Sequence, residues 1–392
     1  MGSRINQEIE CPGGQSLHLR EATLEDQDEI KLLYYQVYGG SYTLPEITNS
    51  DKMKWAINDP NYLWILGFDG GQLVSSVIFV VDSKQLIGKT FAGVVLPEYR
   101  GNKILSRILK RGMDYLMQEE NLCETLYGVV RTFASKGFHN DLYELGFIDL
   151  GIFPNVRKIK RYETHSLKVC YKPQALLKRK KNPVLIPSFN QLYQIVGEKM
   201  ELDQAQVLTP QIKQYQAEDR LGLLIERGKD VEWEYYSQRD HGDLLLDFFP
   251  FHYPEVQLYS RDRNTQVFLF YQEKDEYGAI LGVKSQEENL SVLLGSICDY
   301  AESIGIKYLE LLLPAYDPVL QQIAYKAGFL PSAYYPAMRL NEKGEREDYV
   351  VTSRSFVALN VNSFDLTAEG KPYLWSYCKI YTEKLWEDMK GE

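Results

Sequence analysis

The chain has 392 residues, of which 44% are hydrophobic and 25% are charged, and its formal net charge is −10. This composition excludes a disordered chain, and the length predicts two domains that each bury a core. The acidic balance argues against nucleic acid as a partner, because a phosphate backbone requires a basic surface.

Cysteine usage and hydropathy indicate where the protein works. Its five cysteines are scattered and contain no C-x-x-C pair, which predicts reduced thiols and no zinc or redox site of that kind. No apolar run approaches the roughly 20 residues of a membrane helix, and the polar start lacks the apolar core of a signal peptide. We expect a cytoplasmic protein without a membrane partner; the sequence indicates no oligomeric state.

The first predicted elements are a strand over residues 17–20 and a helix after them. Residues 23–26, T-L-E-D, form a capping box, and Ile30, Leu33 and Val37 then share one helical face. A three-stranded meander follows. Its strands are predicted at residues 62–68, 73–81 and 86–95, and the first two are joined by the hairpin signal D-G-G-Q.

The most informative stretch runs from residue 89 to residue 118. Residues 91–96 read as a buried strand that Pro97 ends, and from Gly101 the apolar period changes to that of a helix. The first amides of a helix have no partner and carry a partial positive charge. Because the residues from Arg100 to Lys103 add two cations, this helix start suits a pyrophosphate.

The run V-x-L-P-E-Y-R-G-x-x-x-L-S-x-x-L resembles motif A of the GNAT acyltransferases. In that family the strand pairs with pantetheine and the loop cradles the pyrophosphate of coenzyme A, so the resemblance implies acetyl-CoA as cofactor. The cofactor-binding residues that it implies are Val94, Val95, Leu96, Arg100, Gly101, Asn102, Lys103, Ile104, Leu105 and Ser106.

Two positions depart from the family pattern. Where the family has glycine and then glycine or alanine, this chain has Lys103 and Leu105. Glycine lets a phosphate approach the backbone closely, so the Lys103 side chain must turn aside or contribute its charge. An ordinary strand-to-helix junction is the alternative interpretation of the stretch.

The same resemblance suggests the other site residues. After a strand predicted at residues 124–132, Y-E-L-G-F is similar to the closing Y-x-x-x-G-F signature, whose tyrosine protonates the departing thiolate. That position is Leu142 here, and Tyr143 is one residue late, about 100° around a helix. Tyr143 and His139 are the candidate acids, with a solvent-exposed loop as the alternative for His139. Tyr38 and Tyr42 lie where the family walls its acceptor pocket, although ordinary packing would also explain them.

The second half repeats the end of the first. Strands are predicted at residues 267–271, 279–283 and 308–313, a helix at 285–304, and Y-K-A-G-F at 325–329 echoes residues 143–147. The capping box at residues 285–288 places two carboxylates at the helix start, so no coenzyme A is expected there. A further strand at 353–359 and an aromatic helix at 373–389 that docks on the body complete the chain.

These patterns predict an α+β fold of two GNAT-like domains, each with a mostly antiparallel twisted sheet flanked by helices. The predicted parts are an acyl-CoA-binding domain at residues 1–172, a linker at 173–183 and a degenerate domain at 184–392. The basic run 178–181 in the linker is expected to be solvated, with an anion or membrane-surface contact as the alternative.

The resemblance implies an N-acyltransferase, in its simplest form an N-acetyltransferase, that acts on a small primary amine. Residues 132–171 are also faintly similar to the β-lysine N-acetyltransferase branch, which would imply an amino-acid-like acceptor. The first alternative is a degenerate protein that binds acyl-CoA or has a structural role, which the two departures favour. The second is a membrane-surface or tRNA-dependent aminoacyl transferase, which would need a strongly basic cleft.

Overall fold

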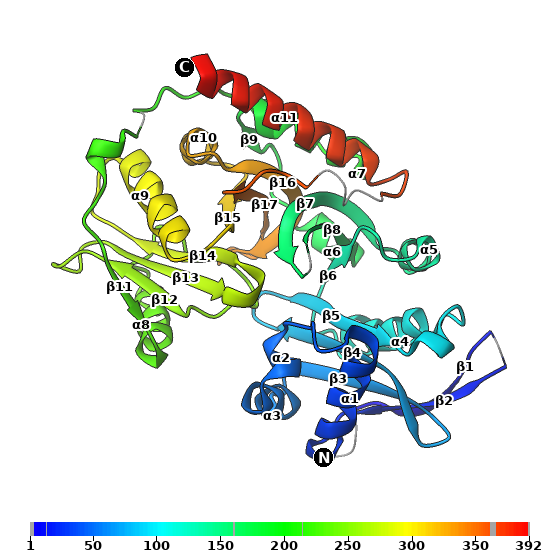
Figure 1. The fold of residues 1–392 in the computed structure, drawn as a ribbon. Coiled ribbons are helices and arrows are strands. Elements are labelled where there is room, and N and C mark those ends of the chain that lie inside the picture. Colours follow the sequence, from blue (N-terminus) through cyan, green and yellow to red (C-terminus); the bar gives the residue numbers. More distant parts are fainter. Residues whose placement is uncertain (1–3, 13, 160, 214, 361–365, 391–392) are drawn as a thin grey trace. The chain divides into compact units, whose positions relative to one another are not determined.

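The computed structural model describes residues 4–12, 14–159, 161–213, 215–360 and 366–390 (Figure 1). The chain forms two compact units. The first consists of Met1–Asp149 and Leu167–Leu177, and the second of Leu150–Ser166 and Lys178–Glu392. Two strands, β7 (Ile148–Lys158) and β8 (Tyr162–Tyr171), therefore contribute residues to both units.

The first unit contains a mixed sheet with the strand order β1-β2-β3-β4-β5-β6-β8. The strands from β1 to β5 pair in antiparallel fashion, whereas β5 and β6 are parallel. The bounds of those not yet given are β1 (Asn6–Glu10), β2 (Ser16–Glu21), β3 (Tyr62–Asp69), β4 (Gln72–Asp82), β5 (Ile87–Val95) and β6 (Thr125–Arg131). The predicted meander and its hairpin are confirmed.

Helices flank this sheet, and most begin or end at a recognisable cap. The predicted capping box at Thr23 and Asp26 is present, and it precedes α1, which ends at the left-handed Gly39. Asn49 and Ser135 cap α3 and α5 through their side chains. The helices of the unit are α1 (Gln27–Tyr38), α2 (Pro45–Thr48), α3 (Ser50–Asn58), α4 (Ile104–Met113), α5 (Lys136–Glu144) and α6 (Pro173–Leu177).

The second unit contains a sheet with the strand order β7-β16-β17-β15-β14-β13-β12-β11. Here β14 and β15 are the parallel pair, and the pairs on either side of them are antiparallel. The bounds are β11 (Leu224–Arg227), β12 (Val256–Tyr259), β13 (Gln266–Gln272), β14 (Tyr277–Lys284), β15 (Tyr308–Pro314), β16 (Leu330–Leu340) and β17 (Arg346–Ser355). A separate parallel pair joins β9 (Val184–Leu185) to β10 (Gln206–Val207).

The last helix of the second unit packs against α7 and β16. Tyr373 and Tyr377 are buried in this contact, while Trp375 and Trp386 are 74% and 59% exposed. The expected docking of the aromatic helix is thus confirmed, with the tyrosines and not the tryptophans as its buried rings. The helices are α7 (Pro187–Met200), α8 (Lys229–Asp240), α9 (Leu290–Ser303), α10 (Pro318–Lys326) and α11 (Lys371–Lys390).

Each unit contains an antiparallel meander followed by a helix and a parallel strand. The series is β3, β4, β5, α4, β6 in the first unit and β12, β13, β14, α9, β15 in the second. The prediction of a mixed fold, with mostly antiparallel sheets flanked by helices, is confirmed. In the described part of the chain, no helix is long and apolar enough to cross a bilayer.

Two predicted boundaries in the second half were wrong. The helix expected from residue 285 begins at Leu290, and its cap is Asn289, whose side chain accepts a hydrogen bond from the amide of Ser291. The strand expected at 353–359 is the end of β17, which stops at Ser355. In both cases the type of element was predicted correctly and its end was misplaced along the chain, because the ends of helices and strands are the least well defined parts.

The basic run was expected to be solvated, and this was wrong for Arg179. Its guanidinium is buried and donates two hydrogen bonds of 2.9 Å and one of 2.6 Å to the Asp348 carboxylate, which is fully buried. Burial alone would lower the pKa of Arg179, but the neighbouring Asp348 carboxylate raises it above its ordinary value. Since a buried charge requires a partner, this pair holds residue 179 against β17.

Candidate functional site

A bulge shapes the end of strand β5. Its register with β4 shifts between Ser76 and Ile78, and Ala92 adopts a left-handed conformation with φ +56°. The pairing of β5 with β6 covers only Ile87–Thr90, so the rest of β5 extends beyond this parallel ladder. A ligand could hydrogen-bond to the strand there.

Not every backbone group at this strand end is available. The Leu96 amide donates to the Val74 carbonyl at 3.0 Å, and the Val94 carbonyl accepts from the Ser75 hydroxyl at 2.8 Å. The amide of Leu96 is therefore paired within the sheet and is not free to meet a ligand. The other predicted residues on the strand are Val94 and Val95, and the Val95 carbonyl accepts a hydrogen bond from the Arg100 Nε at 3.3 Å.

The loop between β5 and α4 presents a row of free amides. A 3-10 turn, Pro97–Tyr99, uses the amides of Tyr99 and Arg100. Within the described residues, no group accepts a hydrogen bond from the amides of Gly101 to Ser106. Gly101 and Lys103 have φ values of +88° and +55°, so the backbone turns through left-handed conformations that form anion-binding concavities. With Arg100 exposed beside them, these amides form a positive cradle.

The side chain of Lys103 points away from this cradle and toward α5. Its Nζ lies 2.9 Å from an oxygen of Glu144 and 3.2 Å from an oxygen of Asp141. The hydrogen bonds to Glu144 and Asp141 raise the pKa of Lys103, which keeps the side chain charged. Ser106 also donates to Asp141, at 2.9 Å. The lysine thus leaves the backbone open to an anion, and within the described residues Arg100 forms no ion pair with a carboxylate.

Leu105 occupies a position where the family has a small residue, and the neighbouring strand compensates for it. A Cβ atom added at Gly93 would lie 3.1 Å from a methyl carbon of Leu105, so the two residues are in contact. The small residue of this contact is therefore on β5 and the large one on α4. The large side chain at position 105 is therefore accommodated by the glycine at position 93, and α4 can still pack against β5.

Of the cradle residues predicted from the sequence, the structure brings together Arg100, Gly101, Asn102, Ile104 and Ser106 around the start of α4. Ile104 is buried below the helix and anchors it, while the side chain of Asn102 donates to Gln15 and to the Tyr99 carbonyl. These two side chains hold the loop in place and leave the backbone amides as the groups that could meet a ligand.

Tyr38 and Tyr42 form one aromatic cluster with Tyr34. The ring centroids of Tyr34 and Tyr42 lie 4.8 Å apart, and those of Tyr38 and Tyr42 lie 4.6 Å apart. The Tyr34 hydroxyl donates to the carbonyl of Ala92, at the bulge of β5. The cluster is therefore anchored beside the strand end, and Tyr34 is the member that the sequence did not single out as a pocket residue.

Tyr143 belongs to a buried polar cluster in the first unit. Its hydroxyl donates to Asp149 at 2.6 Å and lies 3.0 Å from the Nζ of Lys168. Lys168 also forms an ion pair with Asp149, and each of these two side chains is only 1% exposed. Leu142, at the family's tyrosine position, is a buried core residue. The catalytic role of Tyr143 stays a prediction, and its hydroxyl is fixed by Asp149 and Lys168.

His139 was expected to be either a proton donor or an exposed loop residue, and the exposed alternative was wrong. It lies on α5 and is only 3% exposed. Burial lowers its pKa below the ordinary value, and the Lys168 ammonium lowers it further. The ring is therefore neutral at pH 7.

Replacing His139 by glutamine is expected to reduce the loss of stability on acidification. As the pH falls, the unfolded chain binds a proton at His139 before the folded chain does, and this favours unfolding. The contribution of the neutral ring to the free energy of unfolding is therefore complete above about pH 6.5 and is lost as the pH falls below that value. The slope of the unfolding free energy against pH should decrease by up to about 1.4 kcal/mol per pH unit. Urea unfolding between pH 5 and 7.5 measures it, with His241→Gln at an exposed histidine as the control. Equal slopes for His139→Gln and the natural protein would contradict a lowered pKa of His139 in the folded chain.

The sequence matches no protein-family model and no curated protein. Solved structures similar to the chain include several acetyltransferases. One is the GNAT-family acetyltransferase from Streptococcus pneumoniae, with 19% identity, a TM-score of 0.35, and coverage of 40% of this chain and 99% of that chain. Another is a spermidine N-acetyltransferase SpeG chimera from Vibrio cholerae and hSSAT, with 19% identity, a TM-score of 0.34, and coverage of 40% and 95%.

A third similar structure is RimJ from Mycobacterium smegmatis in complex with CoA-disulfide. It is 12% identical, with a TM-score of 0.37, and the match covers 44% of this chain and 91% of that chain. At these identities the likeness concerns the fold alone.

Proposed function

We propose that the first unit is an acyl-CoA-dependent N-acyltransferase, in its simplest form an N-acetyltransferase, that acts on a small primary amine. The observation that carries the proposal is the row of amides from Gly101 to Ser106, which have no acceptor in the described residues and follow Arg100 directly. A pyrophosphate supplies the acceptors that such a row requires.

The cofactor would be held in two places. The cradle at the start of α4 binds the pyrophosphate through its amides and through Arg100. Val94 and Val95, on the part of β5 that extends beyond its ladder with β6, offer backbone groups to the amides of pantetheine. The thioester would then lie near Ala92 and the Tyr34 cluster, where Tyr38 and Tyr42 are the proposed walls of the acceptor pocket.

In the proposed reaction the amine nitrogen attacks the thioester carbonyl, the C–S bond breaks and an amide forms. The nitrogen loses one proton, and one proton reaches the sulfur of coenzyme A. The Tyr143 hydroxyl is suited to donate the proton to the sulfur because Lys168 and Asp149 fix its position, whereas His139, whose protonation burial and Lys168 oppose, is assigned to the packing of α5. These two assignments, and the amino-acid-like character of the acceptor, remain proposals.

The second unit is proposed to be a degenerate copy of the first. Its strands and helices follow the same order around the parallel pair β14 and β15. The start of α9 is capped by Asn289, so fewer amides are free than at α4. The predicted boundaries, 1–172, 173–183 and 184–392, are retained as a proposal, as is a cytoplasmic location, which the five free cysteines suit.

Calorimetric titration with acetyl-CoA tests the cofactor site. The natural protein is expected to bind, and Arg100→Glu to bind at least about tenfold more weakly, because it removes a charge-assisted contact and adds repulsion beside the free amides. Lys54→Glu makes the same change of charge at an exposed position on α3 and should bind as the natural protein does. Equal weakening in both variants, or no binding by the natural protein, would refute the site.

A second function is favoured by one feature, the Leu105 side chain that covers Gly93 at the strand end. In that alternative the first unit binds acyl-CoA without transferring the acyl group. Release of free coenzyme A in the presence of a panel of small amines separates the two. Tight binding without release for any amine would favour the binding protein.

A further inference from the structure

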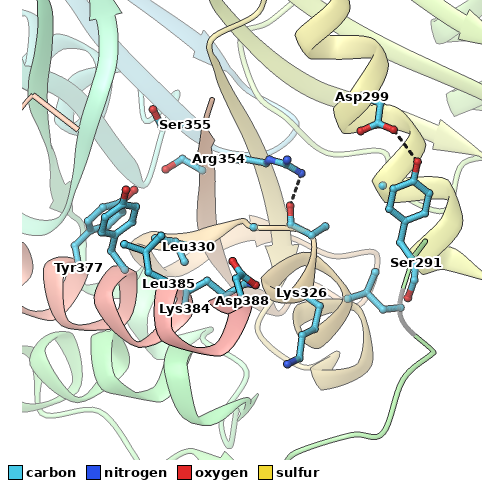
Figure 2. Close-up of a pocket in the computed structure, with 17 residues that line it drawn as sticks. Ser291, Asp299, Lys326, Leu330, Arg354, Ser355, Tyr377, Lys384, Leu385 and Asp388 are labelled. Carbon is cyan, nitrogen blue, oxygen red and sulfur yellow. Dashed lines mark hydrogen bonds and ion pairs between the residues drawn. The ribbon is translucent and has the colours of Figure 1, made fainter. Parts of the chain in front are cut away.

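The second unit contains a pocket of its own, with a volume of about 440 Å³ (Figure 2). Its walls come from α9, from the end of α10 and the start of β16, from the end of β17, and from α11. The volume is in the range that holds a small metabolite. All of these elements belong to one unit, so the pocket is complete within it.

The pocket does not correspond to the cradle of the first unit. The cradle lies where α4 begins, after the carboxyl end of β5. In the second unit the pocket includes Ser353 and Ser355 of β17, and Ser355 pairs with Tyr308, the first residue of β15. The pocket is thus near the amino end of the parallel pair, and Asp299 in its wall belongs to the second half of α9.

Arg354 is the cation of this pocket that lacks a counter-ion. It is half-buried, and its Nη1 donates to the Ala327 carbonyl at 2.7 Å (Figure 2). Its guanidinium lies 4.7 Å from the ring centre of Phe356. Within the described residues, no carboxylate forms an ion pair with Arg354. A guanidinium has five N–H donors, and burying it without an anion is costly.

The other charges of the pocket are already paired. Lys384 forms an ion pair with Asp388, and Lys326 lies 3.4 Å from Glu387. Asp299 lies 3.9 Å from the Nε of Arg220 and accepts a hydrogen bond of 2.6 Å from the hydroxyl of Tyr215. The pocket therefore retains one positive charge, that of Arg354, in a chain whose net charge is −10.

Apolar and aromatic groups surround this charge. Tyr377 and Tyr381 of α11 form one wall, and Leu330 and Leu385 contribute aliphatic surface. Tyr377 is buried, and Leu385 is 45% exposed at the rim. A ligand that fits would combine one anionic group with an apolar or aromatic body.

We propose that this pocket binds a small metabolite that carries one carboxylate or phosphate group on an aromatic body, with the anionic group on Arg354. The guanidinium can donate two hydrogen bonds to either anionic group, and the tyrosines pack against the ring. The site is separate from the proposed acyl-CoA site, and neither depends on the other.

Ligand-observed NMR titration of the full chain with benzoate and with phenyl phosphate tests the proposal. At least one of the two is expected to bind below about 10 mM, and which one binds more tightly tells whether the site is selective for carboxylate or phosphate. Arg354→Gln is expected to weaken binding about tenfold or more, because the charge-assisted contact to the anionic group is lost. Arg261→Gln, at an exposed arginine outside the pocket, should leave binding unchanged.

Leu385→Glu is a second test that does not touch the buried part of the pocket. Since Leu385 lies at the exposed rim, the carboxylate should repel an anion without unfolding the unit, whereas Leu385→Gln should bind as the natural protein does. The proposal is overturned if neither probe binds, if Arg354→Gln binds them as tightly as the natural protein, or if neutral benzyl alcohol binds as tightly as benzoate.

Discussion

Replacing Asp348 by alanine is expected to destabilise the second unit by about 3–5 kcal/mol, the usual cost of removing one partner of a buried ion pair. The Asp348 carboxylate is fully buried and accepts hydrogen bonds from Arg179, from the Tyr334 hydroxyl at 2.5 Å and from the Ala337 amide at 2.8 Å. The variant leaves all three donors without this acceptor. Arg179 retains Asp203, which is half-buried and does not neutralise the far side of the guanidinium.

The neighbouring residue provides the control. Glu347 pairs with Lys180 at 3.1 Å, and both side chains are partly exposed, so Glu347→Ala should cost less than about 1 kcal/mol. Urea unfolding followed by far-UV circular dichroism compares the two variants with the natural protein. A loss for Asp348→Ala no larger than that for Glu347→Ala would show that the buried pair contributes little to the stability of this unit.

The second large effect is expected in the first unit. Asp149→Ala removes the partner of Lys168, and both side chains are only 1% exposed, so the ammonium would be left in the core beside the Tyr143 hydroxyl. We expect a loss of about 3–5 kcal/mol in the free energy of unfolding. Tyr143 also loses its acceptor, so the turnover of any amine that the protein acylates should fall in the same variant.

Two further variants separate charge from packing in this cluster. The double variant Asp149→Leu with Lys168→Met removes both charges and keeps most of the volume, and it should recover much of the stability lost by Asp149→Ala. Asp114→Ala breaks an exposed ion pair with Lys110 and should cost less than about 1 kcal/mol. If the double variant is no more stable than Asp149→Ala, an uncompensated buried charge is not the cause of the loss.

The sequence predicted those parts of the fold that depend on local pattern. The meander from residue 62 to residue 95, its D-G-G-Q hairpin and the capping box at Thr23 were predicted correctly, because alternation, turn residues and caps act over a few positions. The helix after the motif was also predicted, although its final turn, Asp114–Glu119, is π-helical. No signal in the sequence marks such a change of pitch.

The sequence could not predict the long-range ion pairs. Arg179 appeared to belong to a solvated basic run, but its partner lies 169 residues away. Lys168 and Asp149 were not predicted, because both lie in strands that contain other polar residues and no local pattern distinguishes them. The same applies to His139, because the burial of a helix is set by what packs on it.

The position of the candidate site was predicted from the sequence, whereas the hydrogen bonds and side-chain directions within it were not. The positive helix start was anticipated from the motif around Arg100, whereas the capture of the Leu96 amide by Val74 follows from the β-bulge, which the sequence did not reveal. The direction of the Lys103 side chain depends on carboxylates of α5, Asp141 and Glu144, which only the tertiary structure brings near.

The contact between Gly93 and Leu105 shows how a strand and a helix can pack when a large residue stands where a small one was expected. What a strand and a helix need at their crossing is a certain total side-chain volume, and either side can supply it. Here the helix supplies the volume and the strand supplies none. A small residue at position 105 alone would leave a void above β5, so such a residue would fit this chain only together with a larger residue at position 93.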